Sequence, residues 1–179
     1  MKRTLCWMLL GLLLVTLLAG CTANTPGENT PAASDGMYVL FRNTKVSLGM
    51  NYADVKEGLG EESGPAQDVL PCDGNEDGKT ILHFYPGFAV TENVDGVIVE
   101  LEISELYEGE GDAALMGKVK IGATQEEAIA ALGEPNNYPL PEDDYGLMYG
   151  QGNQYIGVFL DPDSNKEIVS SISMLLMEP

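Results

Sequence analysis

Short segments that alternate apolar with polar residues, or are wholly apolar, form two groups along the chain. One group lies between residues 80 and 103 and the other between 147 and 176, and clusters of Gly, Pro, Asn and Asp separate the segments. Such segments are typical of β-strands joined in hairpins. The pattern therefore predicts strands at 80–85, 88–90, 97–103, 147–149, 155–160 and 168–176.

A helical pattern precedes each group. Thr124 and Glu127 have the spacing of a capping box, and an apolar stripe follows them as far as Gly133. The earlier segment has Asn51 as the capping residue and Gly60 as the stop. We expect two helices of about two turns, which are too short to be stable without packing against another element.

The two helical segments follow similar sequences, KVSLGM at 45–50 and KVKIGA at 118–123, seventy-three residues further on. At that offset the identical pairs are Lys45/Lys118, Val46/Val119, Gly49/Gly122, Leu59/Leu132, Gly60/Gly133 and Glu61/Glu134. Further on the offset shrinks by two, and Ile98-x-x-Leu101 aligns with Val169-x-x-Ile172. We infer an internal duplication, with repeat 1 at 37–108 and repeat 2 at 109–179 in one globular domain, 37–179.

Strict alternation assigns the faces of the final strands. It places Val97, Val99, Leu101 and Ile103 on one face, with Ile168, Ser170, Ile172 and Met174 as their counterparts. Glu100 and Glu102 then point the other way, onto a polar and open face. The predicted fold class is α+β: two tandem helix-plus-antiparallel-hairpin repeats forming one sheet, with the short helices on one face.

The N-terminus has the features of a secretion signal, since Lys2 and Arg3 precede an apolar run that ends in Leu-Ala-Gly-Cys. This ending resembles the bacterial lipobox, which implies cleavage after residue 20 and lipid modification of Cys21. Ordinary secretory cleavage beside an incidental cysteine is the alternative. Residues 21–36 are rich in Thr, Asn, Pro and Ala and are expected to form a flexible tether. We expect a lipid-anchored protein on the extracytoplasmic face of a bacterial cell membrane.

The chain is strongly acidic, with 28 Asp and Glu against 9 Lys and Arg and a formal net charge of −19. Loss of Lys2 and Arg3 with the signal would change the charge to −21. This charge argues against nucleic acid and anionic lipid headgroups as partners. Solubility, a basic partner and a bound cation are three readings that the acidity leaves open.

Catalysis has little support in the sequence. The only histidine is His83, on a predicted strand, and no nucleophile-histidine spacing or phosphate-binding glycine loop occurs. Asp73, Asn75 and Asp77 match the first half of a calcium-binding loop, but Phe84 stands where that loop needs a bidentate glutamate. We therefore predict a non-enzyme without a cofactor and leave 73–77 as a weak metal candidate.

The repeated unit carries a family resemblance. A Gly-x-(Thr/Asn)-x-x-(Glu/Asp) helix start, a Leu-Gly-(Glu)-Pro helix end and three strands, twice after a lipobox, resemble the β-lactamase-inhibitor-protein-like (BLIP-like) fold. The single unit is similar to small outer-membrane assembly lipoproteins. The first copy departs from the pattern, with Glu62 where the second has Pro135. The resemblance implies a non-catalytic protein that binds another protein with its sheet, and it identifies no target.

The predicted function is therefore a lipid-anchored, non-enzymatic protein-binding module whose partner is another envelope or extracellular protein. The alternatives are an envelope assembly or structural lipoprotein, and a weakly calcium-responsive surface protein. Tyrosine is common in protein interfaces, so the tyrosines near the strands are candidates together with the outward glutamates. The predicted binding face comprises Tyr85, Glu100, Glu102, Tyr145, Tyr149 and Tyr155.

Overall fold

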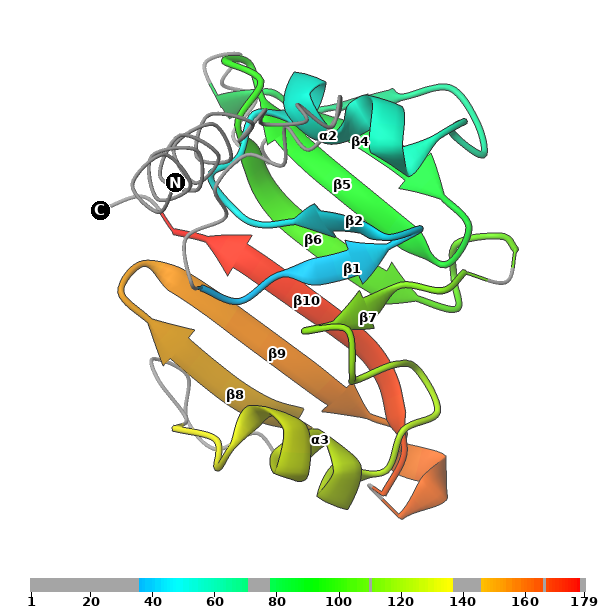
Figure 1. The fold of residues 1–179 in the computed structure, drawn as a ribbon, viewed down its shortest axis with the longest axis vertical. Coiled ribbons are helices and arrows are strands. Elements are labelled where there is room, and N and C mark those ends of the chain that lie inside the picture. The colour runs from blue at the N-terminus through cyan, green and yellow to red at the C-terminus, as the bar shows by residue number, and fades with distance from the viewer. Residues whose placement is uncertain (1–35, 71–77, 110, 137–145, 166, 178–179) are drawn as a thin grey trace, which may run out of the picture. The chain divides into compact units, whose positions relative to one another are not determined.

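A computed structural model of the chain describes residues 36–70, 78–109, 111–136, 146–165 and 167–177. These residues form ten strands, two α-helices and a 3-10 turn (Figure 1). In chain order the elements are β1 (Val39–Phe41), β2 (Thr44–Val46), α2 (Tyr52–Leu59), β3 (Gln67–Val69), β4 (Thr80–Tyr85), β5 (Phe88–Asn93), β6 (Ile98–Ser104), β7 (Ala114–Leu115), α3 (Gln125–Leu132), β8 (Gly146–Gln151), β9 (Gln154–Leu160), η2 (Pro162–Ser164) and β10 (Val169–Leu176).

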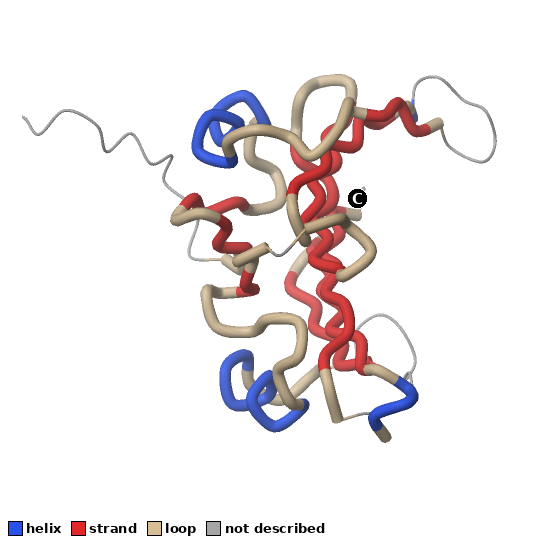
Figure 2. Tube along the Cα trace, turned by 90° about the vertical axis from the view of Figure 1, so that its right-hand side faces the viewer, coloured by secondary structure: helices blue, strands red, loops and turns tan. Residues whose placement is uncertain are grey.

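The strands form two antiparallel sheets. The large sheet has the order β3-β4-β5-β6-β10-β9-β8, and the small sheet has the order β2-β1-β7. Both helices and the small sheet lie on the same side of the large sheet (Figures 1 and 2). The core fills the space between these layers; for example, Phe41 of the small sheet packs against Tyr85 and Phe88, with ring centroids 5.8 and 5.2 Å apart.

The prediction of an α+β fold in which two tandem helix-plus-antiparallel-hairpin repeats form one sheet is wrong. The described chain is mostly β, its two α-helices have eight residues each, and its strands form two sheets. The small sheet is the unexpected element, because β1 and β2 come from the first half of the chain and β7 from the second. Strands of two or three residues carry too little pattern to be recognised, and here they are held by a distant partner such as Ala114 opposite Leu40.

The two helices begin and end as predicted. Asn51 caps α2 by accepting a hydrogen bond from Ala53 N, and Thr124 forms a full capping box with Glu127 at the start of α3. Glycines with positive φ follow the last residue of each helix. No helix in the described part of the chain is long and apolar enough to span a membrane.

The glycine that precedes each helix makes the same contact in both halves. Gly49 and Gly122 have φ of 82° and 84°, which residues with a side chain rarely adopt. In this conformation Gly49 N donates to Ile98 O and Gly122 N to Val169 O, both at 2.8 Å. The glycine of each shared Lys-Val-x-(Leu/Ile)-Gly sequence therefore hydrogen bonds the helix start to the last long strand of its half. The duplication itself stays a prediction.

A β-bulge in each of these strands changes the predicted faces. Val99 is an extra residue in β6 opposite β5, and Ser170 is an extra residue in β10 opposite β9. Ile98 and Leu101 consequently share the buried face, both with 0% exposure, while Val99 is half-buried. The predicted inward positions of Val97 and Val99 are wrong, because strict alternation cannot account for an inserted residue.

Among the described residues, Asn136 pairs with part of the outer edge of β8. Asn136 N donates to Met148 O at 3.1 Å, and the Asn136 side chain both donates to Gly150 O and accepts from Gly150 N, at 2.8 and 2.9 Å. These bonds occupy backbone groups that a neighbouring strand would otherwise use.

Candidate binding face

We call the face of the large sheet turned away from α2, α3 and the small sheet the open face. Neither α-helix and no strand of the small sheet lies over it (Figure 2), and Tyr107 from the loop after β6 contacts it at Phe84 and Glu102. The registers place His83, Tyr85, Leu101 and Met174 on the covered side and their alternating neighbours on the open one. The open face includes Leu82, Phe84, Glu100, Glu102, Tyr155, Phe159, Ser173 and Leu175.

Two carboxylates occupy the middle of the open face. Glu100 and Glu102 lie on the same side of β6, the central strand of the large sheet, and both are half-buried. Glu100 accepts a hydrogen bond from Thr91 Oγ1 at 3.2 Å, and Glu102 accepts one from the Tyr107 hydroxyl. No described lysine or arginine forms an ion pair with either glutamate.

Burial raises the pKa of the Glu100 carboxyl above its ordinary value, and the charge of Glu102 raises it further, against the lowering effect of the Thr91 hydrogen bond. The centre of the open face is therefore an acidic position whose charge is incompletely solvated and has no cationic neighbour among the described residues. Such a position favours the approach of a positively charged group.

Apolar and aromatic side chains surround the two carboxylates. Leu175 of β10 is 41% exposed and lies opposite Glu100, and Tyr155 of β9 lies opposite Leu175. On the other side of β6 the Phe84 and Tyr107 rings meet at a centroid distance of 5.8 Å. The predicted face was polar and open, whereas the observed face combines apolar flanks with an acidic centre.

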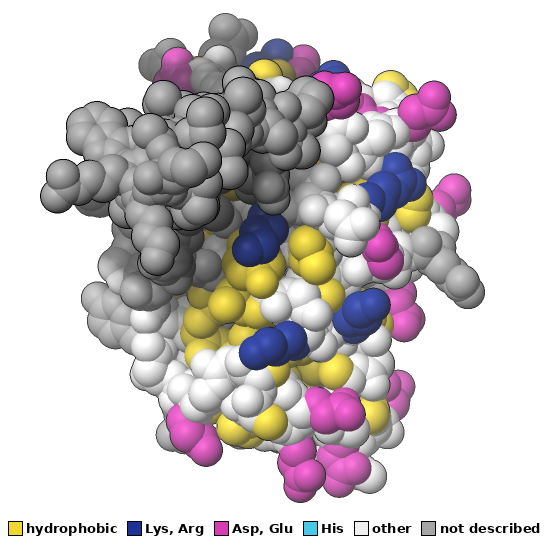
Figure 3. Space-filling view, viewed as in Figure 1, with side chains coloured by type: hydrophobic (Ala, Val, Ile, Leu, Met, Phe, Trp, Pro, Cys, Tyr) yellow, Lys and Arg dark blue, Asp and Glu magenta, His cyan; other side chains and the backbone are white. Residues whose placement is uncertain are grey.

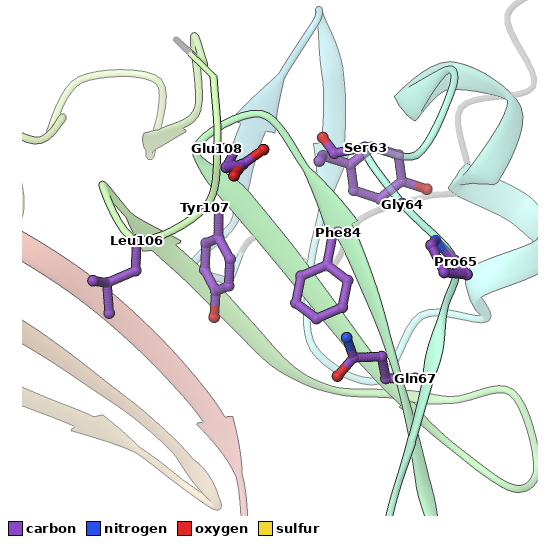
Figure 4. A pocket seen from close by; sticks show the side chains of 9 residues that line it. Ser63, Gly64, Pro65, Gln67, Phe84, Leu106, Tyr107 and Glu108 are labelled. Atoms are coloured by element: carbon purple, nitrogen blue, oxygen red, sulfur yellow. The ribbon is translucent and has the colours of Figure 1, made fainter.

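A pocket of about 320 Å³ opens beside the Phe84–Tyr107 pair (Figure 4). Phe84 comes from β4, Tyr107 and Leu106 come from the loop after β6, and Pro65 comes from the segment before β3. Leu106 is 87% exposed. An exposed leucine beside a pocket with aromatic walls can contact an apolar side chain of another molecule.

His83 belongs to a closed network on the covered side of the sheet. Its Nδ1 is 3.3 Å from Glu62 Oε1, its Nε2 is 3.0 Å from Glu92 Oε1, and its ring stacks on Tyr52 at 3.9 Å. The Tyr52 hydroxyl also contacts Glu62 and, at 2.7 Å, the Tyr85 hydroxyl. Burial raises the pKa of both tyrosines. This network joins α2 to the sheet. Because His83 is only 5% exposed, a substrate has no access to its ring.

The structure brings together part of the predicted binding face. Glu100, Glu102 and Tyr155 lie on the open face, but Tyr85 and Tyr149 are buried on the covered side, with 0% and 5% exposure. Their placement on a binding face is therefore corrected. Tyr149 donates to Gly133 O at 3.1 Å, and burial raises its pKa to about 12. Both tyrosines pack in the core, and the sequence alone does not distinguish a tyrosine that packs in the core from one that binds a partner.

Several predicted positions lie outside the described residues, namely Cys21, Asp73, Asn75, Asp77 and Tyr145. Within the described ranges, no group of three or more His, Cys, Asp or Glu residues could hold a metal ion. The sequence analysis missed Phe84, Leu106, Tyr107 and Leu175. Alternation from Tyr85 and Met174 would have placed Phe84 and Leu175, whereas the loop residues Leu106 and Tyr107 have no pattern that reveals their position.

Comparisons with known proteins give one distant likeness. No protein-family model and no curated protein sequence matches the chain. Among solved structures, the crystal structure of a DUF4309 family protein, YjgB, from Bacillus subtilis is similar, with 20% sequence identity and a TM-score of 0.41. The match covers 70% of this chain and 78% of that protein. A likeness this distant assigns neither a fold family nor a function to the chain.

Proposed function

We propose that the protein is a lipid-anchored, extracytoplasmic and non-enzymatic module that binds another protein with its open face. The observation that carries the proposal is the combination of apolar flanks and an acidic centre on a sheet face that neither α-helix and no strand of the small sheet covers. The Leu-Ala-Gly-Cys sequence at 18–21 supports the anchor. The BLIP-like resemblance of the repeats implies the same class of function.

The size of the open face fits a protein partner. Seven strands spaced at about 4.8 Å give a width of about 29 Å, and strands of six residues give a length of about 20 Å. The resulting area of about 600 Å² approaches the roughly 800 Å² that each protein contributes to a standard interface. A small ligand would need a deeper enclosure, whereas a broad face with a shallow pocket at one side suits a folded or extended protein surface.

The chemistry of the open face favours a partner with a basic residue near an apolar one. A lysine or arginine placed over Glu100 and Glu102 would neutralise the two half-buried carboxylates. An apolar side chain of the partner could at the same time enter the pocket beside Phe84 and Tyr107. A buried apolar anchor with a charged contact beside it is a common form of binding hot spot.

Site-specific photo-crosslinking in the source cells tests the proposal. A photoreactive amino acid at Leu175 on the open face is compared with one at Ala130, an exposed position on α3 on the covered side. We expect a discrete crosslinked protein from position 175 only, and its loss when Glu100→Lys is added. Identical products from both positions, or none from Leu175, would contradict the proposal.

A further inference from the structure

Most of the basic residues in the described part of the chain lie on one side. Of the six lysines and arginines among the described residues, Lys56 and Lys79 form ion pairs with carboxylates. Lys45, Lys118 and Lys120 are exposed and form no ion pair with a described residue. Figure 3 shows the covered side of the large sheet, where Lys and Arg side chains stand around an apolar patch and the carboxylates lie mainly toward the periphery.

The geometry of the small sheet places these lysines beside apolar residues. Val39 and Phe41 are buried, so the neighbouring Tyr38 and Leu40 point to the outer side of the small sheet. Lys45 is the register partner of Leu40, and its Nζ lies 4.7 Å from the centroid of the Tyr38 ring. We call the surface formed by Tyr38, Leu40, Lys45, Lys118 and Lys120 the lysine surface.

The two other lysines are directed outward for the same reason. Lys118 and Lys120 flank Val119, which is 1% exposed and forms a bridge with Leu115 of the small sheet. Both also line a shallow groove of about 610 Å³ that reaches the apolar surface of α3 at Ala130 and Ala131. Glu127 is the carboxylate of this groove, and it is held by the capping box at Thr124.

The connection to the predicted anchor lies at the same surface. The described chain starts at Gly36 and passes through Met37 and Tyr38 into β1, which begins at Val39, one residue before Leu40. The 15 residues at 22–36 would join this point to Cys21. A short tether favours the approach of the surface that surrounds its attachment point, because it confines the domain close to the bilayer.

We propose that the lysine surface rests on the anionic lipid headgroups of the membrane that holds the anchor, so that the open face points away from the bilayer. This inference rests on the anchoring in the proposed function. It also revises the expectation that net charge excludes anionic headgroups. At physiological salt the screening length is about 8 Å, so carboxylates on the distant side of the domain have little influence on the contact.

The chemistry of the lysine surface suits a headgroup layer. Each lysine that lies beside an anionic membrane strengthens the binding of its protein about fivefold relative to a neutral membrane. Tyrosine and leucine at the same level fit the boundary between headgroups and acyl chains, where a side chain with an apolar body and a polar tip is favoured.

Lysine acetylation measured by mass spectrometry tests this orientation. The lipid-carrying full chain is placed in vesicles of phosphatidylcholine alone, or of phosphatidylcholine with one third phosphatidylglycerol. We expect acetylation of Lys45, Lys118 and Lys120 to slow about fivefold in the anionic vesicles. Lys79, which pairs with Asp68 at the edge of the large sheet, is the internal control and should react at the same rate in both.

A second readout uses the variant Lys45→Gln/Lys118→Gln/Lys120→Gln, whose three changes lie at exposed positions. Hydroxyl-radical oxidation of Tyr38 should be slowed by anionic vesicles in the wild type and unaffected by them in the variant. Tyr155 on the open face is the matched residue, and its oxidation should not change in any sample. Protection of Tyr155 in place of Tyr38 would reverse the proposed orientation.

The remaining outcomes separate the orientation from the anchor. If the chain floats with both vesicle types and its lysines react equally in both, the orientation is wrong and the anchor stands. If it floats with neither, the anchor fails and the orientation fails with it. If soluble polyglutamate slows the same three lysines as much as the anionic vesicles do, the surface is a general polyanion site and the inference is overturned.

Discussion

Replacing Glu100 with glutamine should stabilise the folded protein at neutral pH. Glu100 and Glu102 are two residues apart on the same side of β6, which corresponds to a separation of about 7 Å. At an effective dielectric constant of about 20–40, two negative charges at this distance repel each other by about 1–2 kcal/mol. The amide keeps the hydrogen bond from Thr91 but accepts it less strongly, at a cost of about 0.5 kcal/mol.

The net gain of about 1 kcal/mol should raise the melting temperature of a domain of this size by about 4 °C at pH 7 and low salt. The gain should disappear on acidification. The pKa of Glu100 is raised in the folded state, so between its ordinary value of 4.5 and that raised value the folded protein binds more protons than the unfolded chain. The wild type therefore gains stability as the pH falls through this range, and by about pH 4 it should match the variant.

Thermal melts of the wild type and four variants test this reasoning. Glu100→Gln and Glu102→Gln each remove the same repulsion, so the double variant should gain less than the sum of the two by about 1–2 kcal/mol. Glu105→Gln, at an exposed position just beyond β6, is the control and should change stability by less than about 0.5 kcal/mol. Strict additivity, a gain that persists at pH 4, or a loss at pH 7 would refute the assignment of Glu100 as an incompletely solvated charge.

Four further outcomes are expected. Cys21→Ala should release the protein from the membrane fraction, and a variant that still fractionates and labels with fatty acid would exclude the lipid anchor. Leu101→Ala should cost about 2–5 kcal/mol in urea unfolding because Leu101 is fully buried, whereas Leu175→Ala on the open face should cost less than about 0.5 kcal/mol; similar costs would place Leu175 in the core. His83→Leu should cost about 2–3 kcal/mol, since it removes the ring-nitrogen contacts with the part-buried Glu62 and Glu92, and His83→Gln should cost less; equal costs would show that packing alone matters. Calcium and magnesium at equal ionic strength should shift the melting temperature alike, and a calcium-selective rise abolished by Asp77→Asn would instead establish a calcium site.

Local signals in the sequence predicted the helices well. A helix start or end can be recognised from a few neighbouring residues, because the residues at the ends satisfy backbone groups of their own helix. Here these residues are the caps Asn51 and Thr124 and the terminal glycines Gly60 and Gly133. The small sheet could not be predicted in this way. Its pairing of Leu40 with Ala114 depends on residues far apart in the chain, and neither strand is long enough to show a period.

The candidate site was predicted in part. The outward direction of Glu100 and Glu102 follows from alternation along β6, and that reasoning holds on the C-terminal side of the bulge at Val99. On the N-terminal side of the bulge, alternation predicts the face wrongly, because the inserted Val99 shifts the pattern by one residue. Tyr85 and Tyr149 show a different limit, since tyrosine is suited both to an interface and to a buried position with one hydrogen bond for its hydroxyl.

The bonds that Asn136 makes along β8 limit how the protein can associate with itself. The proposed anchor would concentrate the protein in the plane of a membrane, where copies collide frequently and an unprotected sheet edge would allow one sheet to continue into the next. Asn136 occupies the backbone groups of Met148 and Gly150 that such growth would need. Asn136→Ala would free the Gly150 groups, and the expected consequence is the slow formation of edge-to-edge assemblies in place of a dispersed surface population.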